Sequence, residues 1–259
     1  MSINRVSHFY KKNVMILLGW SVLAGLLGCM TTQSLSPAQI EAILAAPDRS
    51  AADRTTDVKR KAPRMLAFLD VQPGMQVLEL GAGGGYTAEL LARLVGPKGH
   101  VVAQNTQTTM QNNVKDRFAQ RMALYSQKNL SLNVRPFDAP LTETQGKGTF
   151  DRVTFLFSYH DLGGAGVNRA HVNQAVFAAL KSGGIYVVAD HSGRAHTGVS
   201  ESKTLHRIDQ ALVREEVESA GFLWVAEADF LRNPLDPRDI PVFKSLQPND
   251  EFVMKFKKP

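Results

Sequence analysis

QVLELGAGGGYTAELLARL, residues 76–94, is the stretch that decides the fold. Its apolar beginning is typical of a parallel strand that is buried on both faces. The glycines that follow allow a tight turn and a close approach of the backbone to a ligand. Leu90, Leu91 and Leu94 then recur at helical spacing. Strand, turn and helix together predict an α/β fold that binds its ligand at the carboxyl end of the sheet, against free helix N–H groups.

The glycine pattern distinguishes between two kinds of nucleotide site. A dinucleotide site favours G-x-G-x-x-G, but Tyr86 stands where the last glycine belongs. The chain instead reads E-x-G-x-G-x-G, formed by Glu79, Gly81, Gly83 and Gly85. This pattern resembles motif I of the class I S-adenosylmethionine (SAM) dependent methyltransferases. The resemblance implies that SAM is the cofactor, that the glycines pass beneath it, and that Glu79 lies near its methionine end. A tight strand–helix turn without a ligand is the alternative.

The resemblance covers residues 64–257 and implies a Rossmann-like α/β architecture. It predicts one seven-stranded, mostly parallel sheet of order 3-2-1-4-5-7-6, with an antiparallel last strand and helices on both faces. We expect strands near residues 76–80, 100–104, 130–134, 150–157, 185–189, 223–230 and 251–256, and helices near 38–46, 50–69 (interrupted near Pro63), 86–94, 106–127, 167–180 and 204–219. A tether and N-terminal helices, residues 29–63, are expected before a methyltransferase-like domain of residues 64–259.

Two further residues are cofactor candidates through the same resemblance. Class I members usually place an acid after the second strand to bind the ribose hydroxyls, and this chain has Asn105 there. An asparagine can accept one such hydrogen bond and donate another. Asp138 follows the third strand, where the family has an acid that accepts from the adenine amino group. A turn-forming role before proline is the alternative for Asp138.

The segment after the fourth strand carries the candidate catalytic residues. Tyr159, His160 and Asp161 follow a strand predicted to be buried, and His191 ends the next strand along the chain, also at the ligand edge. Asp161 could orient His160 as a general base. A hydrogen-bonded turn is the simpler interpretation of this pair. The charges of residues 50–69 favour a solvated face. The alternative is a lid, in which Arg54 or Arg60 could meet an anionic group of a substrate.

The Tyr-His-Asp-Leu stretch and the Leu-His-Arg-Ile-Asp stretch, which contains His206 and Arg207, resemble a group of bacterial predicted methyltransferases that often carry a signal peptide. The implied reaction is methyl transfer from SAM to a small molecule or peptide. One alternative is a membrane-anchored binding module that keeps the fold without turnover. A second is a Zn or Fe site built from His160, Asp161, His191 and His206. Because these residues form no spacing motif, we assign no metal ligand from the sequence.

Composition excludes several classes of protein. The 259 residues with 44% hydrophobic content can bury the core of one domain. Residues 1–28 contribute three of the 30 Lys and Arg and none of the 24 Asp and Glu, so the remainder of the chain carries only +3. The bases are scattered, which argues against nucleic acid as a partner. The single cysteine, Cys29, excludes internal disulfides and a thiolate metal cluster.

The N-terminus predicts export. Two lysines precede a 14-residue apolar run, Val14 to Leu27, which is short for a membrane span and typical of a signal-peptide core. Leu26-Leu27-Gly28-Cys29 resembles the lipobox of bacterial lipoproteins, although Leu27 is bulkier than usual. The resemblance implies cleavage after residue 28, lipidation of Cys29 and a membrane anchor facing the periplasm, with the outer membrane slightly preferred. An uncleaved anchor and a cytosolic protein with a misassigned start are the alternatives.

Overall fold

The structure, a computed structural model, describes residues 1, 35–111, 113–125, 128–139 and 148–259. The predicted signal peptide and the lipobox with Cys29 lie outside the described residues, so both stay predictions. Within the described part, no helix has the length and apolar character that crossing a membrane requires.

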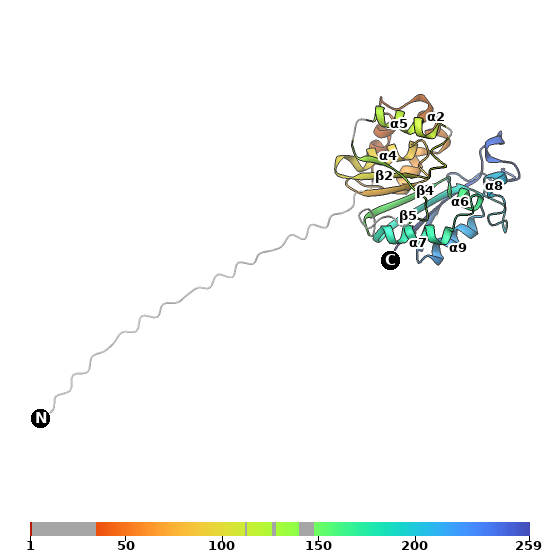
Figure 1. Cartoon of the computed structure of the whole chain (residues 1–259). Coiled ribbons are helices and arrows are strands. Elements are labelled where there is room, and N and C mark those ends of the chain that lie inside the picture. Colours follow the sequence, from red (N-terminus) through yellow and green to blue (C-terminus); the bar gives the residue numbers. More distant parts are fainter. Residues whose placement is uncertain (2–34, 112, 126–127, 140–147) are drawn as a thin grey trace. The chain divides into compact units, whose positions relative to one another are not determined.

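A seven-stranded sheet of order β3-β2-β1-β4-β5-β7-β6 organises the chain, as the sequence predicted (Figure 1). Neighbouring strands from β3 to β5 pair in parallel, and β7 pairs antiparallel with both β5 and β6. The bounds are β1 Gln76–Leu80, β2 His100–Asn105, β3 Leu130–Val134, β4 Phe150–Leu156, β5 Leu180–His191, β6 Leu223–Ala228 and β7 Glu251–Lys257. The carboxyl ends of β1, β4 and β5 therefore meet at one edge.

Helices cover both faces of the sheet. Side chains of β1 alternate between two buried apolar layers, because Val77 packs with α3 and α4 while Leu78 packs with α7 and α9. The α-helices are α1 Pro37–Leu44, α2 Ala51–Lys59, α3 Ala62–Leu69, α4 Tyr86–Val95, α5 Val114–Leu124, α6 Tyr159–Gly164, α7 Arg169–Ala179, α8 Ser202–Leu205 and α9 Gln210–Ser219, and the 3-10 helices are η1 Gly96–Lys98 and η2 Val242–Lys244.

Several helix bounds differ from the sequence prediction for local reasons. The helix expected over residues 50–69 divides before Lys61, whose φ is +47°, and Pro63 then lies in the first turn of α3. Proline is tolerated there because its missing N–H has no intrahelical partner in the first turn. The helix expected over 106–127 is shortened to α5, and the helix expected over 204–219 divides between α8 and α9. Residues 159–164, for which no helix was expected, form α6.

The N-terminal helices are fastened to the sheet domain by ion pairs. Asp53 of α2 is buried and pairs with Arg121 of α5 at 2.8 Å. Asp57 of α2 accepts hydrogen bonds from the Tyr86 hydroxyl at 2.6 Å and from Arg49 at 2.7 Å. These two acids belong to a segment for which the sequence favoured a solvated face. Their pairing holds α2 over the beginning of α4, beside the glycine-rich turn.

Candidate functional site

The glycine turn, residues 81–85, uses its glycines for different purposes. Gly81, Gly83 and Gly85 all have positive φ, at 66°, 53° and 81°. A Cβ on Gly81 would lie 2.9 Å from the Ser158 Cβ, and one on Gly85 would lie 2.9 Å from the Phe118 ring. A Cβ on Gly83 would meet nothing within 4 Å. Gly81 and Gly85 therefore allow close packing within the protein, whereas Gly83 faces open space.

Glu79 lies on β1 directly beneath this turn and is almost fully buried. Burial raises the pKa of Glu79 to about 8, although hydrogen bonds from the Thr87 side chain and the Ala88 backbone act in the opposite direction. Its Oε2 atom has no hydrogen-bond partner among the described residues. A buried carboxylate with a free oxygen is costly unless a donor or a cation meets it.

The last two residues of β2, Gln104 and Asn105, have different contacts, which the sequence did not show. The Oδ1 atom of Asn105 accepts from the Gly83 N–H at 2.8 Å, and its Nδ2 atom donates to the Gly83 carbonyl at 2.9 Å. Asn105 thus holds the glycine turn in shape. The neighbouring Gln104 is also buried, and its Oε1 atom lacks a partner in the described structure. Asp138 lies half-buried in the turn after β3.

A cavity of about 550 Å³ opens over the glycine turn. Its lining includes Glu79, Gly83, Arg60, Phe157 and Ser158. Glu79, which lines this cavity, and Gln104, which lies at the end of β2 outside its lining, each have an unpartnered acceptor, Oε2 and Oε1 respectively, that needs a donor. SAM carries an ammonium, ribose hydroxyls and an adenine amino group, all of which donate. The donor set that these residues need therefore fits SAM.

His160, at the beginning of α6, is held by Asp190, which the sequence analysis did not name, and it also contacts Asp161. The His160 Nδ1 atom lies 2.7 Å from Oδ1 of the fully buried Asp190, whose Oδ2 accepts the His160 backbone N–H at 2.7 Å. Asp161 faces the other ring nitrogen, Nε2, at 3.2 Å. Burial alone would lower the pKa of His160, but the carboxylates of Asp190 and Asp161 outweigh it and raise the pKa to about 10.

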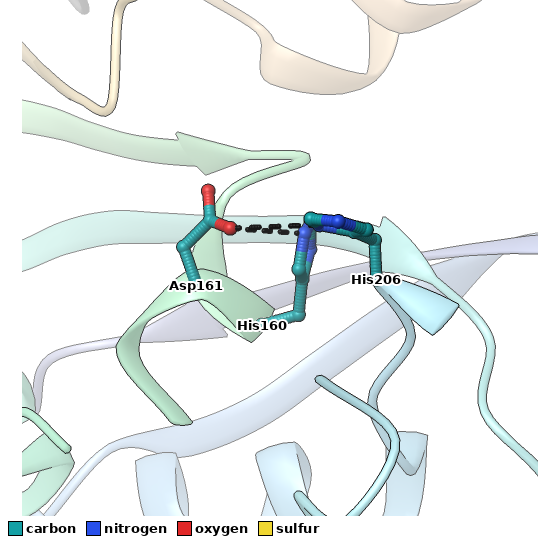
Figure 2. A group of neighbouring side chains, drawn as sticks. All are labelled: His160, Asp161 and His206. Carbon is teal, nitrogen blue, oxygen red and sulfur yellow. Dashed lines mark ion pairs between the residues drawn. The ribbon is translucent and has the colours of Figure 1, made fainter. Parts of the chain in front are cut away.

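His206 completes a group that we call the histidine cluster, defined as His160, Asp161 and His206. Figure 2 shows the two imidazoles and the carboxylate turned toward one another. The His206 Nδ1 atom lies 3.9 Å from Asp161 Oδ1, and its ring centroid lies 5.5 Å from that of His160. His191, at the end of β5, stays beside the cluster. Its ring centroid lies 5.8 Å from that of His160, and its Nδ1 atom lies 2.9 Å from Glu251.

The Tyr159 side chain does not contact the histidine cluster. Its side chain is buried and packs edge-on against Phe155. The Tyr159 hydroxyl donates to Glu216 of α9 at 2.9 Å and accepts from Asn173 of α7 at 2.8 Å. Burial, together with Tyr186 and the Glu216 carboxylate, raises the pKa of Tyr159. The tyrosine therefore fastens α6 to the helices behind it, because both hydrogen-bond partners lie away from the histidine cluster.

Arg60, at the end of α2, separates the cavity over the glycine turn from a second cavity of about 1030 Å³ and lines both. The guanidinium carbon of Arg60 lies 3.3 Å from the ring centroid of Phe157, which follows β4 with a φ of +62° that is rare for a bulky residue. Burial lowers the pKa of Arg60, against the raising effect of the Glu251 carboxylate. No carboxylate in the described part of the chain forms an ion pair with Arg60.

The second cavity is largely apolar on one side. Its lining includes Phe230, Leu235, Phe243 and Leu246, with His191 and Glu251 at the sheet edge. Three of these apolar side chains, Leu235, Phe243 and Leu246, are strongly exposed. Sequence reasoning did not find this cavity, because its walls come from α2, β5, β7 and the irregular connection before β7. It also gave no role to Asp190, although the Asp-His pair ending the fifth strand was a visible signal.

Comparisons with known proteins identify relatives of this chain. Residues 46–197 match the family model of protein-L-isoaspartate(D-aspartate) O-methyltransferase. The protein-L-isoaspartate O-methyltransferase of Methanothermobacter thermautotrophicus is 50% identical over 44 residues, which is 15% of this chain and 20% of that protein. The enzyme of that name from Rhizobium meliloti is 31% identical over 107 residues, or 39% of this chain and 45% of that protein. The matches thus span less than half the length of either relative.

One solved structure matches a larger part of this chain than these relatives do. A SAM-dependent methyltransferase from Aquifex aeolicus superposes with a TM-score of 0.57 at 15% identity, covering 86% of this chain and 98% of that one. At this level of identity the agreement concerns the fold. Together with the family match, it supports SAM as the cofactor of the cavity over the glycine turn.

Proposed function

The chain belongs to the protein-L-isoaspartate(D-aspartate) O-methyltransferase family, and from this premise we propose that it transfers the methyl group of SAM to a carboxylate of a small molecule or peptide. The observation that supports a carboxylate acceptor is Arg60. This arginine lies between the cavity over the glycine turn and the second cavity, and it has no ion-pair partner among the described residues.

Residues of the glycine turn would hold the cofactor. SAM, when bound, supplies a methyl group activated by a neighbouring sulfonium. Glu79 would meet the ammonium, Gln104 would accept from a ribose or adenine donor, and Gly83 would leave the space that the cofactor needs. The sequence candidates Gly81, Gly85, Asn105 and Asp138 remain part of the proposal, the first three chiefly by shaping the turn.

Arg60 would position the acceptor. A guanidinium binds a carboxylate through two parallel hydrogen bonds, which fixes the direction of its oxygens. The ring of Phe157 keeps one face of the guanidinium away from water. An acceptor carboxylate held here would lie beside the cofactor cavity, and alignment of donor and acceptor is the main contribution that an enzyme makes to such a transfer.

The second cavity suggests what accompanies that carboxylate. Its apolar wall of Phe230, Leu235, Phe243 and Leu246 favours an acceptor with an apolar portion. A carboxylate is already the nucleophilic form of its group, so this transfer requires no general base. His160, Asp161 and His191 would then border the acceptor and orient it, which is a different task from the proton removal that the sequence suggested for His160.

The test is a methyl-transfer assay with the full chain, SAM labelled in its methyl group, and a panel of apolar carboxylates and peptides. The expected product is a base-labile methyl ester. Arg60→Gln should raise the KM for the acceptor about tenfold or more, since a charge-assisted bidentate contact is lost. Lys59→Gln is the matched control, because Lys59 lines the same cavity but is exposed, and it should leave the KM unchanged.

Two outcomes would change the assignment. SAM binding without transfer to any acceptor would favour the alternative of a binding module that keeps the methyltransferase fold. Transfer that is equally fast in Arg60→Gln would remove the argument for a carboxylate. The predicted lipid anchor is a separate proposal, checked by acyl labelling of the full chain expressed in a bacterium. The label should be present in the wild type and absent from Cys29→Ser.

A further inference from the structure

We propose that the histidine cluster is a binding site for a divalent first-row transition metal, with His160, His206 and Asp161 as its ligands. The ligand atoms of the three residues all lie within 4.8 Å of one another. They converge from two parts of the fold, the beginning of α6 and the junction between α8 and α9 (Figure 2). This site is distinct from the glycine turn and does not depend on methyl transfer.

The distances are close to those that a metal requires. Bonds of about 2.0–2.2 Å place two neighbouring ligand atoms about 2.8–3.6 Å apart, the shorter separations in octahedral and the longer in tetrahedral geometry. The separation of 3.2 Å between His160 Nε2 and Asp161 Oδ1 already meets this condition. His206 Nδ1 lies 3.9 Å from the same oxygen. A small rotation of the His206 side chain, which is 35% exposed, would close the remaining gap.

Asp190 prepares His160 for this role. Metal-binding histidines usually give their second ring N–H to a carboxylate or carbonyl, which fixes the tautomer and the orientation of the ring. Asp190 is fully buried, contacts His160 Nδ1 at 2.7 Å, and is itself held by the backbone N–H groups of His160 and His191. The Nε2 atom of His160 is thereby directed toward Asp161 and His206. Two carboxylates around one imidazole also favour a cation on charge grounds.

His206 is held in place by its neighbours in the chain. Its backbone has a φ of +55°, which is uncommon for a residue other than glycine. On its C-terminal side, Arg207 is buried in an ion pair with Asp236, and the Ile208 N–H donates to the His191 carbonyl at 3.1 Å. The His206 ring also packs against Phe243 at a centroid distance of 4.9 Å. These contacts orient the imidazole toward His160.

The donor set indicates which metals fit. Two imidazoles and one carboxylate suit Zn²⁺, Fe²⁺ or Mn²⁺ better than Mg²⁺ or Ca²⁺, which prefer oxygen ligands. Asp161 is 57% exposed, so a coordination position on its side stays open for water or a ligand oxygen. His191 and Phe243, which contact the histidine cluster, also line the second cavity. A metal at this place would therefore adjoin the proposed acceptor.

Calorimetric titration with Zn²⁺ tests the site, using the full chain without a histidine tag after treatment with a chelator. We expect one equivalent of Zn²⁺ to bind. Asp161→Asn and His206→Ala should each weaken the affinity about tenfold or more, and Asp190→Asn, which changes a partner of a ligand, by about 10–100-fold. His196→Ala is the matched control, because His196 is exposed, also has a positive φ, and lies outside the cluster. It should bind Zn²⁺ as the wild type does.

Binding of Co²⁺ gives a second readout, because nitrogen and oxygen ligands change its visible absorption spectrum. The change should be present in the wild type and in His196→Ala and absent from Asp161→Asn combined with His206→Ala. Equal Zn²⁺ binding by the wild type and this double variant, or no binding by the wild type, would overturn the proposal. SAM titration of the same samples shows that they are folded, so a failure of the metal site is separable from a failure of the cofactor site.

Discussion

The glycine turn and the histidine cluster lie at the same edge of one sheet, but they are built in different ways. The turn is one contiguous segment whose shape follows from three glycines at positive φ and from Asn105. The histidine cluster is assembled from α6 and from the break between α8 and α9, and it depends on Asp190 of β5. The first site is thus specified by local sequence, and the second by contacts between distant segments.

This difference has consequences for stability. In the glycine turn, the cost of a substitution depends on the space around a single residue. In the histidine cluster, the position of each ligand depends on interactions several residues away, above all on the ion pair between Arg207 and Asp236. A mutation that leaves all three ligands intact can therefore still move the side chains of the histidine cluster apart.

The largest effect is expected from Arg207→Met. Arg207 and Asp236 are both fully buried and lie 2.9 Å apart, and Arg207 also donates to the Ser192 and Ile240 carbonyls. Removing the arginine leaves a buried carboxylate without its partner, which costs about 3–5 kcal/mol. Urea unfolding measures the loss.

The control for this prediction is Arg214→Met. Arg214 pairs with Glu218 at 3.2 Å on the exposed face of α9, where such pairs contribute less than about 1 kcal/mol. If both variants lost the same small amount of stability, the histidine cluster would not depend on the ion pair between Arg207 and Asp236 in the way that we describe.

The glycine turn should show a distinctive pH dependence through Glu79. Its pKa is raised to about 8 in the folded protein, so between pH 4.5 and about 8 the folded state holds a proton that the unfolded state has lost. Stability should therefore fall as pH rises through this window, by at most about 4 kcal/mol between pH 5 and pH 8 at ~1.4 kcal/mol per unit. Urea unfolding at several pH values measures the slope. Glu79→Gln should make this slope shallower, and an identical slope in both proteins would contradict the burial argument.

The contrast also explains what could be predicted from the sequence. The order of the sheet was predicted correctly because the resemblance to the class I methyltransferases implies it, and the glycine turn was predicted correctly because glycine spacing is a local signal. The helical state of residues 159–164 and the break at His206 were not, because they depend on partners elsewhere in the fold. The role of Asp190 in holding His160 was missed for the same reason. Asp161 is the neighbour of His160 in sequence, but Asp190 is the residue that contacts the His160 Nδ1 atom.

Within the glycine turn, substitutions of Gly81 and Gly83 should distinguish a glycine that is needed for close packing from one that leaves space for the cofactor. Alanine at either position must adopt a positive φ, which destabilises the folded state by about 1–2 kcal/mol. Gly81→Ala also places its Cβ 2.9 Å from Ser158, so overpacking should raise its cost to about 2–4 kcal/mol. Both losses can be read from urea unfolding. The larger Gly83→Val substitution should fold and yet lose SAM binding in calorimetric titration. Normal SAM affinity in that variant would place the cofactor elsewhere.

The smallest effect is expected from Asp161→Asn in protein freed of metal. Asp161 is more than half exposed and contacts His160 and His206 only through its carboxylate, so its loss should change the free energy of unfolding by less than about 1 kcal/mol. The comparison becomes informative when Zn²⁺ is added. A metal at 100 times its Kd stabilises the folded wild type by about 2.7 kcal/mol, and Asp161→Asn should not gain this amount. A loss of several kcal/mol without metal would instead make Asp161 a structural residue, because a ligand of an open site contributes little until the ion that it binds is present.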